Sequence, residues 1–145
     1  MEIKTGQQLE RAVTKLAKAL GLEARSQVAM GKRIWGRGRR VDVILRNPDT
    51  GQRLGIECKF QKVGGTAEEK IPLTITDIEA WPIRGLVVVH GEGFSPDFRA
   101  FIRSTGKVVE FEDLANWLGF FFDLPEERAE QAVMSLNGSA DAQTD

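Results

Sequence analysis

Apolar side chains near the start of the chain recur at the spacing of an α-helix. They occupy one helical face at four positions: Leu9, Val13, Leu16 and Leu20. Residues three or four apart lie on the same side of a helix, so this face is expected to pack on a core. Thr5 precedes the pattern as a capping residue, and Gly21 follows it as a helix-ending residue. The pattern predicts an amphipathic helix between these two residues.

Several later segments have the short apolar runs and β-branched residues of strands. Residues 40–46 and 52–61 flank the turn sequence Asn47-Pro48-Asp49-Thr50-Gly51, so we expect them to form a hairpin. Residues 86–89 form a continuous apolar run, which is typical of a strand buried on both faces. Two shorter strands are predicted at residues 23–29 and 107–111.

Helix-start signals occur in the second half of the chain. Thr66 and Glu69 have the spacing of a capping box, and Pro72 is expected to break or restart the helix that follows. The tripeptide Ser95-Pro96-Asp97 combines a cap, a first-turn proline and an early acid. Closing helices are predicted at residues 112–118 and 125–136, and residues 137–145 are expected to be a disordered tail.

The order of these elements is that of an α/β fold with a mixed central β-sheet flanked by helices. A chain of 145 residues, of which 41% are hydrophobic, is long and apolar enough for one core. We therefore expect a single domain at residues 1–136.

Composition excludes several classes of site. The single cysteine, Cys58, excludes an intrachain disulfide and a zinc site with several cysteines. The single histidine, His90, excludes a metal site built from several histidines. No apolar stretch reaches the roughly 18 residues of a membrane helix, and the N-terminus does not resemble a signal peptide. A cytoplasmic protein with no membrane contact and no organic cofactor is expected.

Charge is divided unevenly along the chain, although the net charge is only -1. Residues 1–65 carry 14 Lys and Arg against 6 Asp and Glu, whereas residues 66–145 carry 6 against 15. The basic half suggests a polyanionic partner such as DNA. Its most cationic segment, residues 31–40, also holds three glycines, which allow a close backbone approach to phosphate. The candidate nucleic-acid-binding residues are Lys32, Arg33, Trp35, Arg37, Arg39, Arg40 and Lys62.

Two acids are brought together by the predicted hairpin. A turn centred between Asp49 and Thr50 places Asp42 directly opposite Glu57, where side chains on one face lie about 5 Å apart. Such a pair repels unless a cation or a shared proton intervenes. Side chains two residues apart share a strand face, so Lys59 and then Gln61 continue the row of Glu57. The side chain of Cys58 faces the core.

Hydrolysis of a phosphodiester needs the groups that this hairpin supplies. Asp42, Glu57 and the backbone carbonyl of Cys58 can offer oxygen ligands to a hard divalent cation. Such a cation lowers the pKa of a bound water and neutralises charge on a phosphoryl oxygen. The ammonium group of Lys59 can orient that water or stabilise the developing negative charge.

Asp42 followed by Glu57-Cys58-Lys59 resembles the PD-(D/E)xK nuclease superfamily, and the resemblance covers roughly residues 4 to 111. It implies a restriction-endonuclease-like fold in which Asp42 and Glu57 bind Mg²⁺, with Mn²⁺ as a substitute, and Lys59 is the catalytic lysine. Glu10 matches an acid on the first helix that joins the metal site in many members, and Gln61 is similar to a glutamine in several branches. One departure is Val41, which stands where the motif has proline.

These features together predict a magnesium-dependent endodeoxyribonuclease. A Holliday-junction resolvase of the same fold is an alternative, and a non-catalytic DNA-binding accessory module is a third interpretation. The catalytic candidates are Asp42, Glu57, Lys59 and Gln61, and the metal candidates are Glu10, Asp42, Glu57 and the Cys58 carbonyl. A homodimer is expected, with the aromatic cluster Trp117, Phe120, Phe121 and Phe122 serving as core or as a dimer contact.

Overall fold

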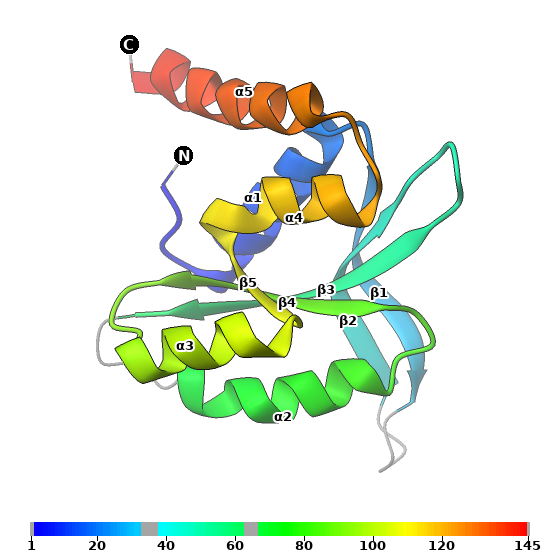
Figure 1. Ribbon diagram of the computed structural model, residues 1–145, viewed down its shortest axis with the longest axis vertical. Coiled ribbons are helices and arrows are strands. Elements are labelled where there is room, and N and C mark those ends of the chain that lie inside the picture. The colour runs from blue at the N-terminus through cyan, green and yellow to red at the C-terminus, as the bar shows by residue number, and fades with distance from the viewer. Residues whose placement is uncertain (1, 33–37, 63–66, 145) are drawn as a thin grey trace.

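A five-stranded mixed sheet with the order β1-β2-β3-β4-β5 is covered by helices on both faces in a computed structural model (Figure 1). The structure describes residues 2–32, 38–62 and 67–144. The strands are β1 Glu23–Lys32, β2 Gly38–Arg46, β3 Arg53–Gln61, β4 Gly85–Gly91 and β5 Val108–Glu110. The helices are α1 Gly6–Ala19, α2 Ala67–Glu79, α3 Pro96–Thr105, α4 Phe111–Phe121 and α5 Glu126–Thr144. The predicted α/β class and mixed sheet are confirmed.

Two hydrophobic cores lie on opposite faces of the sheet. Figure 1 shows α1, α4 and α5 over one face and α2 and α3 over the other. The apolar face predicted for α1 is buried in the first core, where Leu9 and Val13 are fully buried. Thr5 caps α1 as expected, because its side chain accepts a hydrogen bond from the Gln8 N–H. None of the described helices has the length and apolar character that crossing a bilayer requires.

The β2–β3 hairpin has the register that the sequence predicts. Val43 pairs with Ile56 and Leu45 with Leu54, which is the alignment that places residue 42 opposite residue 57. The turn is closed by a hydrogen bond from the Gly51 N–H to the Asn47 carbonyl. Gly51 has φ +77, a left-handed conformation that favours glycine. Strands β3, β4 and β5 then run parallel to one another.

A close approach between α2 and the sheet fixes the start of β3. Gly55 and Gly85 face each other across the parallel β3–β4 pair, and the Trp81 ring packs over both. A Cβ at Gly55 would lie 2.7 Å from Trp81 Cζ3, and one at Gly85 would lie 2.7 Å from Ile78 Cβ. Only residues without a side chain fit here, two positions before Glu57.

Helices α2, α4 and α5 differ from their predictions, and α4 runs from Phe111 to Phe121 where the sequence predicts residues 112–118. Helix α2 runs unbroken from Ala67 to Glu79 with Pro72 inside it, so the expected break is wrong. Pro72 is the sixth residue of the helix, where it removes one backbone hydrogen bond, and burial of Ile71, Ile75 and Ile78 against the sheet offsets this cost. Helix α5 continues to Thr144, past the point where the sequence analysis ends the domain, and no proline interrupts it.

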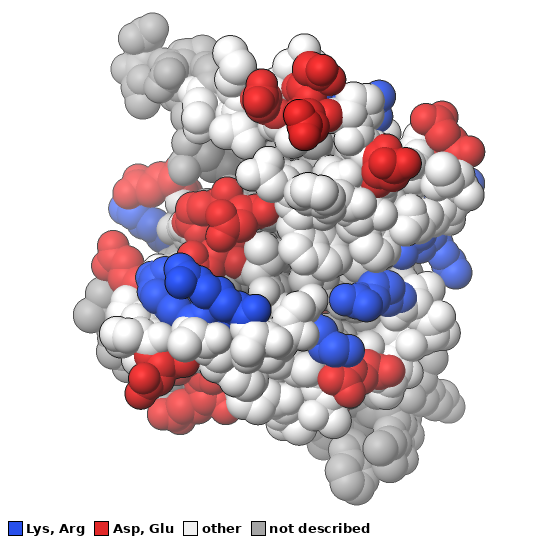
Figure 2. Space-filling model, in the orientation of Figure 1, with Lys and Arg blue, Asp and Glu red and all other residues white. Residues whose placement is uncertain are grey.

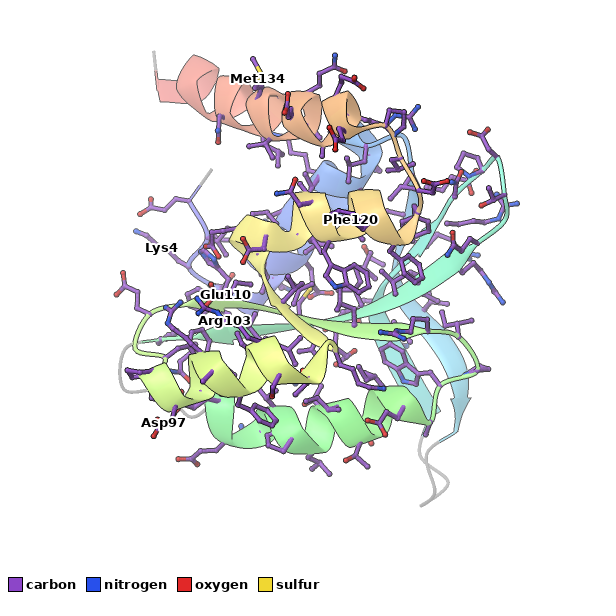
Figure 3. All side chains as sticks on the ribbon, viewed as in Figure 1. Lys4, Asp97, Arg103, Glu110, Phe120 and Met134 are labelled. Carbon is purple, nitrogen blue, oxygen red and sulfur yellow. The ribbon has the colours of Figure 1, made fainter. Side chains whose placement is uncertain are left out.

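The aromatic cluster of α4 is divided between core and surface. Phe122 is buried, and Trp117 and Phe121 stack on each other beside the first core with ring centroids 5.3 Å apart. Phe120 is 90% exposed, and Figure 3 marks its position on α4. Three of the four aromatic residues therefore belong to the core or its border.

Candidate active site

Asp42 and Glu57 lie in contact where β2 separates from β3. The paired register of these strands ends at Val43 and Ile56. Just beyond this point, the backbone N–H of Asp42 donates to Glu57 Oε1 over 3.3 Å. The backbone N–H of Cys58 donates to Asp42 Oδ2 over 2.8 Å. The hairpin thus brings the two predicted acids together, with Asp42 Oδ2 fixed by the backbone of β3.

The alternation of β2 is interrupted at Asp42. Val41 packs in the core beneath α2 and α3, whereas Val43 packs in the core beneath α1, although residues two apart normally share a strand face. This local twist leaves Asp42 half-buried at the border between the two layers. A carboxylate in that position is costly to bury without a partner, and the Cys58 N–H supplies one.

Gln27 connects Asp42 to Glu10 on α1. Its Nε2 donates to Glu10 Oε1 over 2.6 Å and lies 3.4 Å from Asp42 Oδ1, so one amide nitrogen bridges two carboxylates. The β1–β2 register places Gln27 opposite Asp42, because Ser26 pairs with Val43. Gln27 also has φ +52, an uncommon conformation for a residue with a side chain. The bridge places Glu10 beside the acid pair, as the resemblance implies.

The pKa values of nearby groups reflect this gathering of negative charge. Burial raises the pKa of Glu10, the hydrogen bond from Gln27 lowers it, and the Asp42 carboxylate raises it again. Burial also raises the pKa of the Cys58 thiol well above its ordinary value, and the carboxylates of Asp42, Glu10 and Glu57 add to this shift. The Lys59 ammonium lowers that same pKa. Three carboxylates and one ammonium therefore act on a single point of β3.

Cys58 and Lys59 have the orientations that the hairpin predicts. The Cys58 side chain is buried in the core beneath α1, which leaves its backbone as the part that belongs to the site. Lys59 pairs with Val89 of β4 and Glu57 with Val87, so both side chains are on the opposite face of the sheet from Cys58. Lys59 is partly exposed.

Gln61 occupies a different environment from the acids. It is only 2% exposed, its Nε2 donates to the Glu92 carbonyl, and its Oε1 accepts from the Glu68 N–H. These bonds tie the start of α2 and the end of β4 to β3. Gln61 follows Lys59 on the same strand face, as alternation predicts, but its side chain is buried and supports the surrounding backbone.

The structure describes only some of the predicted nucleic-acid-binding residues. Arg33, Trp35 and Arg37 lie outside the described residues, as do the side chains of Lys32 and Arg39. Arg40 and Lys62 are exposed at the ends of β2 and β3 that lie on the side of Asp42 and Lys59. Their position leaves both cations free to contact a polyanion.

Gln27 is a site residue that no pattern in the sequence predicts. Nothing in the segment around it marks a functional residue, because a lone glutamine in a polar strand is common on protein surfaces. Its importance arises from the β1–β2 register, which sets it opposite Asp42, and from the position of α1 above it.

The donor set has the chemistry of a site for a hard divalent cation. Within residues 2–32, 38–62 and 67–144, no three His, Cys, Asp or Glu side chains are already assembled in a metal-holding cluster. The Gln27 amide instead lies between Glu10 and Asp42, where its hydrogens meet two anionic oxygens as a cation would. Carboxylate and carbonyl oxygens are the ligands that Mg²⁺ and Mn²⁺ prefer. The residues present therefore fit such an ion.

Comparison with known proteins identifies the family of the chain. No curated protein matches the chain. A crystal structure of a protein of unknown function, AF1548, has a similar fold with a TM-score of 0.53 and 17% sequence identity. The match covers 90% of this chain and 65% of that one, so this chain spans about two thirds of the length of the protein it resembles. The family model described as a PD-(D/E)XK nuclease superfamily domain matches residues 2–121, and the chain therefore belongs to the PD-(D/E)XK nuclease superfamily.

Proposed function

We propose that this protein is a divalent-metal-dependent endodeoxyribonuclease, with Mg²⁺ as its ordinary metal. The contact between Asp42 and Glu57, with Lys59 following on the same strand face, is the observation that carries the proposal. Two carboxylates held together favour a cation between them, and a bound cation would remove their repulsion of a phosphate group.

The metal would be held by Asp42, Glu57 and the Cys58 carbonyl, with Glu10 as a further acid. Asp42 Oδ2 is engaged by the Cys58 N–H, so Oδ1 is the oxygen of Asp42 that can turn to a metal. A bound Mg²⁺ supplies a water of lowered pKa and neutralises charge on the phosphoryl oxygen. Gln27 holds Glu10 and Asp42 near each other before the metal arrives, because its amide donates to both.

Lys59 would supply positive charge at the site. Its ammonium can donate hydrogen bonds to the attacking water or to a phosphate oxygen as negative charge develops there. Parallel pairing with Val89 and burial of the neighbouring Cys58 side chain hold its backbone in place. Gln61 contributes indirectly, because its two backbone contacts fix the end of the strand that carries Lys59.

The test is a substrate panel with purified protein. Plasmid, linear duplex, single-stranded DNA and a four-way junction are each incubated with Mg²⁺, Mn²⁺ or EDTA. We expect cleavage with either metal, none with EDTA, and a loss of at least about 100-fold for Asp42→Asn and for Lys59→Gln, which is the scale of a lost electrostatic or acid–base contribution. Asp49→Asn, which changes an exposed acid in the hairpin turn, is the matched control and should cleave normally.

The same panel separates the alternatives. Paired symmetrical nicks in the four-way junction, with little cutting of linear duplex, would identify a resolvase. Salt-dependent DNA binding with no cleavage under any condition would indicate a non-catalytic binding module and refute the nuclease proposal. Sedimentation analysis of the same sample tests the proposed homodimer.

A further inference from the structure

A groove beside the acid pair is lined by a row of cations on α1. It has a volume of about 640 Å³ and lies between α1 and β1. Arg11, Lys15 and Lys18 line it from α1, at spacings of four and three residues that place them along one helical stripe. Glu10 is the one acid among its described lining residues, so the groove carries a net positive charge.

This groove lies next to the candidate active site. Gln27 lines the groove and also donates hydrogen bonds to Glu10 and Asp42, so the groove and the acid pair share this side chain. From Glu10, the cation row continues along α1 toward its C-terminal end. Arg11 and Lys18 are seven residues apart, which is about 10 Å along the helix, and the phosphates of one B-DNA strand rise about 3.4 Å per nucleotide along the duplex axis. The three long cationic side chains can therefore reach neighbouring phosphates of one strand.

The three cations are available for a ligand. Arg11 and Lys18 are exposed and Lys15 is partly buried. Among the residues that the structure describes, no carboxylate forms an ion pair with any of them. Elsewhere in the described chain, Arg46, Arg99 and Lys107 are each paired with an acid. The cations of α1 therefore differ from those that serve local structure.

The face that carries α3, α4 and α5 is a poor alternative for DNA. Figure 2 shows acidic side chains gathered over α4 and α5, with cations limited to separate groups. The first turns of these two helices contribute Glu112, Asp113, Glu126 and Glu127. In Figure 1, α1 lies behind α4, away from this acidic face. A phosphate backbone is attracted to the α1 side and repelled from the α4–α5 side.

We propose that the α1–β1 groove binds the phosphodiester backbone of duplex DNA on one side of the cleaved bond, through Arg11, Lys15 and Lys18. This inference rests on the proposed nuclease function and deepens it, because it assigns a binding track separate from residues 31–40. Ser26 supplies an uncharged hydroxyl donor on the β1 wall of the groove. Phosphate contacts of this kind position a substrate without reading its sequence.

The experiment measures duplex affinity against salt for wild type and for the triple variant Arg11→Gln/Lys15→Gln/Lys18→Gln, in EDTA so that no cleavage occurs. Each phosphate contact contributes about 0.9 to the slope of log K against log salt, so the slope should become shallower by about 2.7. Between 50 and 200 mM salt, the wild-type Kd should therefore rise about 40-fold more than that of the variant. The matched control, Arg53→Gln/Arg84→Gln/Arg103→Gln, removes the same charge away from the groove and should keep the wild-type slope.

A second measurement locates the contacts on the DNA. Once the cleaved bond is mapped, single methylphosphonate substitutions neutralise one phosphate at a time. Wild type should lose affinity for up to about three adjacent neutralised phosphates on one side of the bond, and the triple variant should be indifferent to those same positions. The loss of affinity on neutralising a phosphate differs between wild type and the triple variant only if the groove cations contact that phosphate.

The outcomes separate the two proposals. If wild type binds and cleaves DNA while the triple variant keeps the same salt slope and the same methylphosphonate pattern, the groove assignment is overturned and the nuclease proposal stands. If wild type neither binds nor cleaves DNA, both are overturned. A shallower slope in the triple variant together with an unchanged slope in the charge-matched control supports the groove.

Discussion

Replacing Gly55 by alanine should destabilise the fold through one identifiable contact. The added Cβ would lie 2.7 and 2.9 Å from Trp81 Cζ3 and Cε3, where ordinary contacts begin at 3.4 Å. The indole is itself 8% exposed and packs over Gly85 as well, so it has little room to withdraw. The perturbation tests whether the strand that carries Glu57 and Lys59 is positioned by this tryptophan.

Two opposing effects set the size of the change. Overpacking a core by one methyl group costs about 1–3 kcal/mol. Alanine in a strand recovers about 0.5–1 kcal/mol over glycine, because the unfolded chain loses less freedom. The difference is a net loss of up to about 2.5 kcal/mol, and the 2.7 Å approach to a buried ring favours the upper half of this range, which lowers Tm by several degrees in a domain of this size. Gly85→Ala should lose more, because its Cβ would meet Ile78 Cβ, which moves only with the α2 backbone.

The assay is urea unfolding of Gly55→Ala in two backgrounds, wild type and Trp81→Leu. Leucine at residue 81 removes the ring atoms that Gly55→Ala would strike, so the alanine should there be neutral or stabilising. The coupling between the two positions should be about 1–3 kcal/mol. An equal loss in both backgrounds would refute the reasoning, because the ring would then not be the obstacle.

Three further predictions concern the site. Burial and the Asp42 carboxylate raise the pKa of Glu10, so ionisation of Glu10 destabilises the metal-free folded state as the pH rises through that pKa. Glu10→Gln should therefore raise the metal-free Tm at pH 7. The gain should vanish below about pH 4, where Glu10 is protonated in both the folded and the unfolded state. Gln27→Gly and Gln27→Ala both remove the amide bridge, but glycine relieves φ +52, so Gln27→Gly should be the more stable by about 1 kcal/mol in urea unfolding. Gln61→Leu removes the partners of two backbone groups, so it should lower unfolding stability by about 1–3 kcal/mol for each group, whereas a purely catalytic glutamine would leave stability unchanged.

The acid pair could be predicted from the sequence because its geometry is local. A five-residue turn fixes the register of two adjacent strands, and that register places residue 42 opposite residue 57 without reference to the rest of the fold. Thr5 and Ser95 cap helices for the same reason, since each bonds an N–H three residues away.

The remaining features depend on contacts between distant segments. Gln27 becomes part of the site only because β1 lies beside β2 and α1 lies above both, and no local pattern encodes that contact. Gln61 alternates correctly with Lys59, but α2 and the end of β4 close over it and bury it. Pro72 breaks a helix in isolation, whereas packing of the isoleucine face of α2 stabilises the helix here.

The cations of α1 likewise could not be assigned a function from a local sequence pattern. The apolar positions of that helix identify its buried face, so its charged residues read simply as the solvated face. They become a candidate binding surface only once β1 forms the other wall of the groove and Gln27 joins that groove to the acids. The charge pattern therefore identifies the basic half of the chain, but it points to residues 31–40 and Lys62 and not to α1.

The proposed mechanism requires Asp42 and Glu57 to share a divalent cation. The Tm measured with and without metal tests this requirement in the absence of DNA. A ligand at one hundred times its Kd stabilises the folded state by about 2.7 kcal/mol, so saturating Mg²⁺ or Mn²⁺ should raise the Tm of wild type and of the turn control Asp49→Asn by several degrees. Asp42→Asn, which keeps an oxygen to accept from the Cys58 N–H but loses the charge, should fold and show no such rise. A metal-induced rise in Asp42→Asn as large as that of wild type would contradict the proposed metal site.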